Sequence, residues 1–181
     1  MCTIIVNKQN TEATYDMVFE FPENWISQQY DDAKSFYRQH YKQFADSKSV
    51  DIVAFDTETQ SLWLIEVKDY RAFPKRDRAI MDTIAIKVRD TLACLFVERL
   101  KDADSLAARA ARLQRIRVVF HLEQPVKPSK LYPQVIDWAN GQLKLKQVVR
   151  VIDPHPILCN MQQMPHQCSW SVSERRRMPP G

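Results

Sequence analysis

Three charged side chains stand in two apolar stretches of the N-terminal half of the chain. Asp51 opens the stretch from Val50 to Asp56, and Glu66 and Lys68 lie near the end of the stretch from Leu62 to Asp69. Both stretches are rich in β-branched and aromatic residues and are too short for typical helices, so we predict two strands joined by a polar turn. Carboxylates at this spacing are the groups that hold a hard cation such as Mg²⁺. An ammonium group beside them is suited to contact a phosphate oxygen or a water molecule.

The pairing of the two predicted strands brings the carboxylates together. Side chains alternate along a strand, so Glu66 and Lys68 share one face of the second strand. Both faces of that strand also carry apolar residues, which is typical of a central strand covered by helices on each side. If Asp56 faces Ser61 across the turn, Asp51 faces Glu66 directly. Two opposed carboxylates repel each other unless a cation lies between them.

A second interpretation of the same residues stays open at this point. Glu66 and Lys68 also have the spacing of a structural ion pair at the end of a sheet, with Asp51 as an ordinary residue at the start of a strand. The tripeptide Glu-x-Lys is common by chance. An acidic residue opening the preceding apolar strand favours the metal-dependent chemistry over the purely structural role.

The spacing of these residues resembles a known family. Asp51, fourteen intervening residues, and then Glu66-Val67-Lys68 closing an apolar strand are similar to the motif of the PD-(D/E)XK nuclease superfamily, including the archaeal Holliday-junction resolvases. The Pro-Asp dipeptide that names the superfamily is Val50-Asp51 here. The resemblance covers roughly residues 22–100.

The resemblance implies a restriction-endonuclease-like αβββαβ core. This is an α/β fold with a mixed central sheet flanked by helices on both faces, and here it would carry an additional helix and strand at the C-terminal side. It also implies that Asp51 and Glu66 are ligands of Mg²⁺ or Mn²⁺, with the carbonyl of Val67 as a further ligand. Lys68 would be the residue that orients or deprotonates the attacking water.

Composition excludes several other classes of protein. The chain has 181 residues, of which 45% are hydrophobic and 27% charged, as expected for one soluble domain. Only two glycines occur, Gly141 and Gly181, which excludes a P-loop and a Rossmann fingerprint. No apolar run approaches the length that spans a membrane. The four cysteines are too scattered for a disulfide framework, so we expect a reducing, cytoplasmic setting.

The distribution of charge favours a polyanionic partner. Residues 1–70 carry a net charge of −6 and residues 71–181 a net charge of +10, which together give the formal charge of +4. A basic C-terminal portion beside an acidic site is suited to nucleic acid. The basic residues expected to contact it are Arg71, Lys75, Arg76 and Lys87. The alternative is that these side chains only solvate the surface.

Apolar periodicity predicts the remaining elements. We expect an edge strand over 15–21, a helix over 22–45, a long helix over 79–100, a helical segment over 102–114 and a strand over 115–122. A further helix over 133–146 and a short strand over 148–152 would follow. Residues 1–154 would then form a single domain, with residues 155–181 as a partly disordered tail.

These observations together predict a metal-dependent nuclease that hydrolyses phosphodiester bonds, with DNA favoured over RNA. A homodimer or a larger defence, repair or recombination assembly would supply the recognition surface that such a small chain lacks. The alternative from another class is a catalytically inactive subunit of the same fold that binds nucleic acid or acts as a scaffold.

Overall fold

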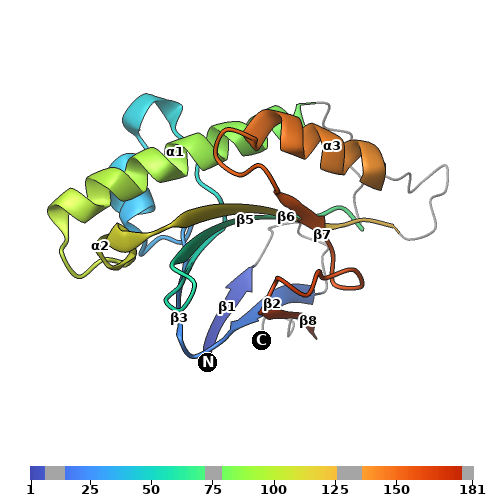
Figure 1. Cartoon of the computed structure of the whole chain (residues 1–181), viewed down its shortest axis with the longest axis horizontal. Helices are drawn as coiled ribbons and strands as arrows, with labels where there is room; N and C mark the ends of the chain where they lie inside the picture. The colour runs from blue at the N-terminus through green and yellow to red at the C-terminus, as the bar shows by residue number, and fades with distance from the viewer. Residues whose placement is uncertain (7–14, 72–78, 126–135, 177–181) are drawn as a thin grey trace, which may run out of the picture.

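The structure has three layers, in which two helices, a five-stranded sheet and a three-stranded sheet lie one on another (Figure 1). It is a computed structural model that describes residues 1–6, 15–71, 79–125 and 136–176. The α/β class expected from the sequence is therefore confirmed. One hydrophobic core lies between the helices and the larger sheet, and a second lies between the two sheets.

The central layer is a mixed five-stranded sheet with the order β3-β4-β5-β6-β7. Its strands are β3 (Trp25–Gln29), β4 (Ile52–Asp56), β5 (Ser61–Asp69), β6 (Arg115–Glu123) and β7 (Ile157–Cys159). Strands β3, β4 and β5 form an antiparallel meander, whereas β6 and β7 add in parallel to β5. The predicted hairpin register is confirmed, because Asp56 pairs with Ser61 and Ile52 pairs with Ile65.

Both long helices cover the same face of this sheet (Figure 1). Helix α1 (Ile80–Lys101) connects β5 to β6, and α3 (Trp138–Val149) connects β6 to β7. Parallel crossovers are right-handed as a rule, so two successive crossovers that move the same way across a sheet place their helices on one side. The expectation of helices on both faces is therefore wrong. The short helix α2 (Leu106–Arg109) and the 3₁₀ turn η3 (Ala110–Arg112) follow α1.

The opposite face of the central sheet is covered by the second sheet, with the order β1-β2-β8. Its strands β1 (Cys2–Val6), β2 (Tyr15–Phe21) and β8 (Ser171–Arg176) are all antiparallel. The predicted strand over 15–21 is thus confirmed, but it is the middle strand of this sheet and not an edge. Aromatic side chains fill the space between the sheets, with Trp25 and Trp63 stacked at 5.7 Å and Trp63 and Trp170 edge to face at 5.1 Å.

The helix predicted over residues 22–45 does not form. Residues 25–29 are strand β3, and only the single turns η1 (Tyr37–Tyr41) and η2 (Phe44–Asp46) are helical in this range. The apolar residues at helical spacing were misleading because the sheet offers Trp25 and its neighbours five backbone partners on β4. The described residues before Asp51 therefore contain none of the long helix that the αβββαβ core implies.

The C-terminal segment belongs to the fold. Helix α3 continues to Val149, so the strand expected over 148–152 is wrong, and the last strand of the central sheet is β7 at 157–159. Strand β8 pairs with β2, which corrects the expectation of a partly disordered tail for the residues up to Arg176. The boundary expected at residue 154 falls within a continuous structure. Residues 177–181 lie outside the described residues.

Candidate active site

Two carboxylates and two ammonium groups meet between helix α1 and the central sheet. The Nζ atom of Lys87 lies 2.8 Å from both carboxylate oxygens of Glu66 and 4.0 Å from Oδ1 of Asp51. The Nζ atom of Lys68 lies 2.7 Å from Oε1 of Glu66. Asp51 is fully buried and Glu66 is 1% exposed, whereas the two lysine side chains are 16% and 26% exposed. We call these four residues the charged cluster.

The alternation of β5 aims Glu66 and Lys68 at the helix. Leu62 and Leu64 belong to the core beneath the helices, and Ile65 and Val67 belong to the core between the sheets. Glu66 therefore continues the helix-side row, as the sequence predicts. Its position in the middle of a strand with both neighbours buried leaves its carboxylate little freedom to turn toward solvent.

Asp51 lies just outside the ladder of β4 and β5. Its backbone N–H donates to the carbonyl of Ile65 at 3.1 Å, and its Oδ2 atom accepts a hydrogen bond from the N–H of Val67 at 2.7 Å. Its own carbonyl accepts from the N–H of Tyr30 on the other side. The paired register ends at Ile52. Asp51 therefore lies on a bend and is not a directly opposed strand partner of Glu66.

Helix α1 also fixes the backbone that leads to Asp51. The hydroxyl of Thr91 accepts the N–H of Val50 at 3.0 Å, and the carboxylate of Asp90 accepts the N–H of Lys48 at 3.0 Å. Sequence reasoning did not identify these contacts. The available signal was the spacing of Lys87 and Thr91, since residues four apart lie on one face of a helix.

The positive and negative charges within the charged cluster compensate each other. The two carboxylates face two ammonium groups, and Glu66 contacts both lysines. Burial by itself would lower the pKa of Lys68, but the charges of Glu66 and Asp51 more than offset this, so the pKa of Lys68 is raised above its ordinary value. Lys68 is therefore a hydrogen-bond donor at neutral pH and not a general base in this arrangement.

The donor set fits a hard divalent cation. Oxygens of Asp51 and Glu66 converge on one ammonium group, so the two carboxylates already share a position for positive charge. Mg²⁺ is commonly held by one or two carboxylates together with water and substrate phosphate. Within the described ranges there is no group of three or more His, Cys, Asp and Glu residues that could hold a metal.

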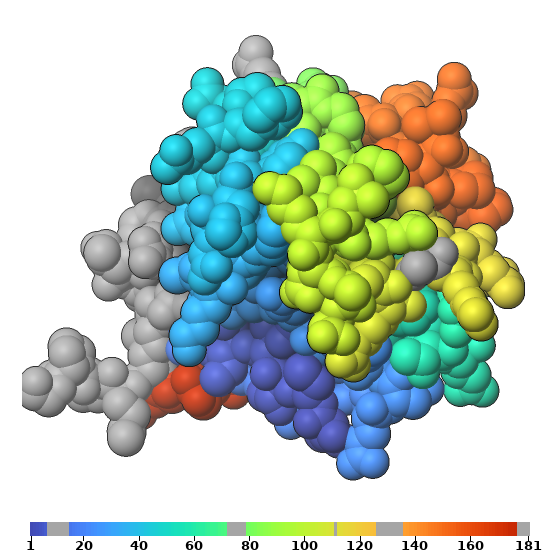
Figure 2. Space-filling model, turned by 90° about the vertical axis from the view of Figure 1, so that its left-hand side faces the viewer, coloured from blue at the N-terminus to red at the C-terminus, as the bar shows by residue number. Residues whose placement is uncertain are grey.

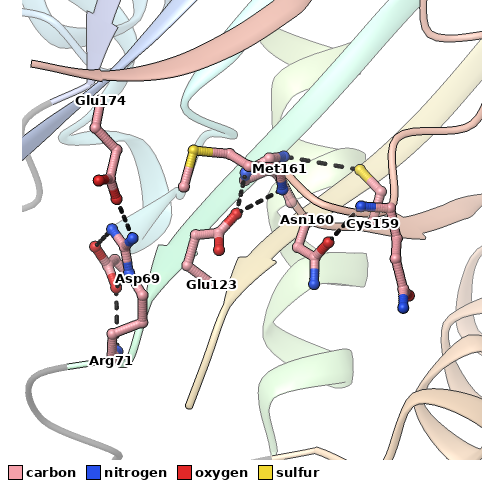
Figure 3. A network of polar contacts seen from close by, with 9 residues as sticks. Asp69, Arg71, Glu123, Cys159, Asn160, Met161 and Glu174 are labelled. Carbon is pink, nitrogen blue, oxygen red and sulfur yellow. Dashed lines mark hydrogen bonds and ion pairs between the residues drawn. The ribbon is translucent and has the colours of Figure 1, made fainter. Parts of the chain in front are cut away.

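The other predicted contacts lie elsewhere. Arg71 pairs with Asp69 at the end of β5 and with Glu174 on β8, so its charge is already compensated by two carboxylates (Figure 3). Asp69 follows the alternation of β5 onto the face opposite to Glu66. Lys75 and Arg76 lie outside the described residues. Of the four basic residues expected to contact nucleic acid, Lys87 is the one that the structure places in the charged cluster.

A second polar group lies near the ends of β6 and β7, on the side of the three-stranded sheet. The Nε2 atom of His121 is 2.9 Å from Oε1 of Glu123, which also accepts the N–H of Met161 (Figure 3). The thiol of Cys159 lies 3.8 Å from the Nδ1 atom of His121, and both residues are fully buried. Burial and a hydrogen bond with Cys168 raise the pKa of Cys159, so this thiol is a packed group and not a nucleophile.

Comparisons with known proteins give one partial relative. No protein-family model and no solved structure matches the chain. A cysteine–tRNA ligase of Neisseria meningitidis serogroup A / serotype 4A (strain DSM 15465 / Z2491) is 30% identical over 164 residues. The match covers 68% of this chain and 22% of the ligase, so the chain spans less than a quarter of the length of that relative. A match of this extent does not assign the chain to a family.

Among the described helices, none is both long and apolar enough to cross a membrane.

Proposed function

We propose that the protein is a Mg²⁺- or Mn²⁺-dependent nuclease. The observation that carries the proposal is the convergence of Asp51, Glu66, Lys68 and Lys87 on one buried point at the edge of the paired region of β4 and β5. A structural ion pair needs only one carboxylate and one ammonium group. Two acids sharing a cation position beside a partly exposed lysine are suited to bind a metal ion and a phosphate together.

The topology around the cluster supports the same proposal. An antiparallel meander of three strands, a long helix and a fourth strand parallel to the third occur in this order in β3, β4, β5, α1 and β6. This order is consistent with the βββαβ part of the core that the sequence resemblance implies. Of the proposed ligands, Asp51 directly precedes the second strand of the meander and Glu66 lies on the third, in agreement with the resemblance.

The mechanism follows from the positions of the side chains. Asp51 and Glu66 would hold the cation, with the carbonyl of Val67 as a further ligand. A bound Mg²⁺ or Mn²⁺ would polarise the phosphate and acidify water. Lys68, kept protonated by its acidic neighbours, would donate a hydrogen bond that orients the attacking water or the phosphate. Attack of the water oxygen on phosphorus would break one P–O ester bond, with one proton of the attacking water released to solvent and one proton taken up from solvent by the departing oxygen.

The substrate class remains part of the proposal. DNA is the first candidate, and the partial relative, which is named as a tRNA ligase, is the reason to test RNA with equal care. Recognition by a homodimer or within a larger defence, repair or recombination assembly also belongs to this proposal. The four cysteines are free thiols, which is consistent with the cytoplasmic location that we propose.

A second candidate function is supported by one observation. The two lysines already neutralise the two carboxylates, so the charged cluster is stable without a metal ion. A catalytically inactive subunit that binds nucleic acid or acts as a scaffold would retain this arrangement. It differs from the nuclease in one measurable respect, because it binds nucleic acid without metal-dependent turnover.

The experiment that separates the two is a cleavage assay on linear, circular, branched and single-stranded DNA and on RNA that includes tRNA. Each substrate is incubated with Mg²⁺, Mn²⁺ or EDTA and with wild-type, Asp51→Ala or Lys68→Ala protein whose folding is verified by circular dichroism. The nuclease predicts cutting that needs the metal and is lost in both folded variants. Binding without cutting on every substrate would instead support the inactive subunit.

A further inference from the structure

The connection between β3 and β4 displays an aromatic side chain on the surface. Phe44 is 65% exposed, and its ring centre lies 5.4 Å from that of the half-buried Tyr41. Tyr41 packs against the helix-side core, so it anchors the pair. We call residues 37–48 the aromatic turn. A large aromatic ring that is exposed to solvent lacks the stabilisation that burial gives an apolar side chain.

The backbone beside Phe44 is strained and firmly held. Ala45 and Asp46 have φ values of 50° and 52°, a left-handed conformation that is sterically unfavourable for residues other than glycine. The hydroxyl of Ser47 donates to the carbonyl of Tyr41 at 2.9 Å, and the hydroxyl of Tyr37 donates to the carbonyl of Ser47 at 2.6 Å. The strained conformation is therefore fixed by local hydrogen bonds that keep the exposed ring in place.

Basic side chains lie on the same turn as the two rings. Arg38, Lys42 and Lys48 are exposed, and with Asp46 they give the aromatic turn a net charge of +2, whereas residues 1–70 as a whole carry a net charge of −6. Arg89 of α1, whose side chain is 70% exposed, interacts electrostatically with Tyr41. Exposed aromatic rings interleaved with cations are the elements of a surface that binds single-stranded nucleic acid.

The aromatic turn leads directly into the candidate active site. Asp51 follows Phe44 by seven positions, so the Cα atoms of the two residues can be at most about 25 Å apart. Helix α1 holds the end of the turn through Asp90 and contributes Lys87 to the charged cluster. Figure 2 shows this part of the chain, in cyan, standing at the surface beside the green first half of α1.

We propose that the aromatic turn is a platform for single-stranded nucleic acid, on which an unpaired base stacks against Phe44 while Arg38, Lys42 and Lys48 contact the adjacent phosphates. A paired base has both faces covered by its neighbours, so the platform selects unpaired nucleotides. The binding itself does not depend on the proposed nuclease function. Only the step by which the bound strand becomes the substrate rests on that function.

The test is fluorescence anisotropy of labelled single-stranded DNA and RNA oligonucleotides in EDTA, where no metal-dependent cleavage occurs. Loss of one base–aromatic stack costs roughly 1–3 kcal/mol, so Phe44→Ala should weaken binding by about 5- to 150-fold. The matched control is Phe96→Ala, because Phe96 is 63% exposed and lies at the other end of α1. This control should bind like the wild type, and a duplex of the same sequence should bind more weakly than the single strand.

A second variant tests the role of the cations. In a plot of the logarithm of the binding constant against the logarithm of the salt concentration, Lys42→Ala should make the slope less steep by about 0.7. This is the change expected for the loss of one phosphate contact to a single strand. Equal affinity of the wild type and Phe44→Ala would overturn the proposal, and so would a wild-type protein that binds no oligonucleotide. All these measurements are made in EDTA and do not depend on cleavage. A protein that binds as predicted but cuts no substrate would therefore support the binding platform and contradict the proposed nuclease function.

Discussion

Glu66 is the residue on which the charged cluster depends. Glu66 is 1% exposed, and its carboxylate forms ion pairs with the ammonium groups of Lys68 and Lys87. The buried negative charge of Glu66 is therefore compensated. A buried ion pair adds little net stability, but removal of one partner leaves an uncompensated charge. Lys87 contacts both carboxylates, so the divalent cation that we propose would have to compete with its ammonium group for the same oxygens.

The competition by Lys87 gives a prediction at this scale. Lys87→Met removes the resident ammonium group and should tighten the binding of Mg²⁺, because the two carboxylates then lack part of their compensation. A tighter complex stabilises the folded protein more at the same metal concentration. Thermal unfolding with and without Mg²⁺ should show a larger rise in Tm for Lys87→Met than for the wild type.

The control for this prediction is Lys101→Met, at the exposed end of the same helix. Its Mg²⁺-induced shift should equal that of the wild type. Equal shifts in all three proteins would contradict the view that Lys87 occupies the cation position.

Glu98 gives a prediction about pH. The hydroxyl of Tyr30 donates to its carboxylate at 2.7 Å. Burial raises the pKa of Glu98, the hydrogen bond from Tyr30 opposes this, and the charge of Asp102 adds to it, with a net raised pKa. The folded protein therefore binds this proton more tightly than the unfolded chain, and the resulting stabilisation, present at low pH, is lost as the pH rises through the folded pKa.

Glu98→Gln imitates the protonated carboxyl at every pH. Its Tm should be close to that of the wild type at about pH 4 and should exceed it increasingly toward about pH 8. The measurement is thermal unfolding of both proteins across this range. A difference in Tm that stays constant with pH would exclude titration of Glu98 as its cause.

At the scale of elements, α1 links the parts of the candidate active site. It contributes Lys87 to the charged cluster and holds the backbone before Asp51 through Asp90 and Thr91. The helix packs on the sheet through the buried residues Ile84, Val88 and Leu95. A shift of this helix would therefore move both sides of the site together.

Thr91→Val tests the link between the helix and the strand. The substitution keeps the shape of the side chain but leaves the buried N–H of Val50 without its acceptor, which costs about 1–3 kcal/mol. We expect lower stability in urea unfolding and, on any substrate that the wild type cuts, slower cleavage at temperatures where the variant is folded. Thr91→Ser retains the hydroxyl and should recover most of the cleavage rate. A serine variant that cuts as slowly as the valine variant would show that the hydroxyl does not position Asp51.

Patterns in the sequence predicted those elements whose residues alternate or repeat strongly. The β4–β5 hairpin, helix α1 and strand β6 were found because their apolar residues follow one period throughout. Strand β3 was missed because Ile26, Tyr30 and Tyr37 also fit a helical repeat, and only pairing with β4 decides between the two. The hairpin register predicted that Asp51 lies near Glu66 and Lys68, although Asp51 stands on a bend just outside the paired residues and does not face Glu66 directly. The contact of Lys87 with both carboxylates could not be predicted, since it depends on how α1 lies across the sheet.

At the scale of the whole molecule, two sheets and a helical layer enclose two cores. Trp170, next to β8, packs against Trp63 of the central sheet and against Phe21 of β2, so the C-terminal segment closes the core between the sheets. No local pattern predicts this packing, because the partners of Trp170 lie more than 100 residues away in the chain.

Trp170→Ala should therefore destabilise the entire fold. Trp170 is 5% exposed, and truncation of a buried tryptophan costs about 3–5 kcal/mol. Urea unfolding followed by circular dichroism should show a single transition at a lower midpoint. The control Val151→Ala, at a residue that is 91% exposed, should unfold like the wild type. Two separate transitions in the tryptophan variant would contradict the view that both cores form one cooperative unit.

The most direct test of the proposed activity is the single-turnover rate of cleavage of the best nucleic-acid substrate in Mg²⁺. The rate is measured for the wild type, for Lys68→Ala and for Lys144→Ala, an exposed lysine of α3 outside both the charged cluster and the aromatic turn. Loss of a group that positions the reacting water or phosphate should slow cleavage by about 10²- to 10⁴-fold in Lys68→Ala, while Lys144→Ala retains the wild-type rate. Wild-type cleavage that persists in EDTA, or folded Lys68→Ala protein that cuts as fast as the wild type, would contradict the proposed site.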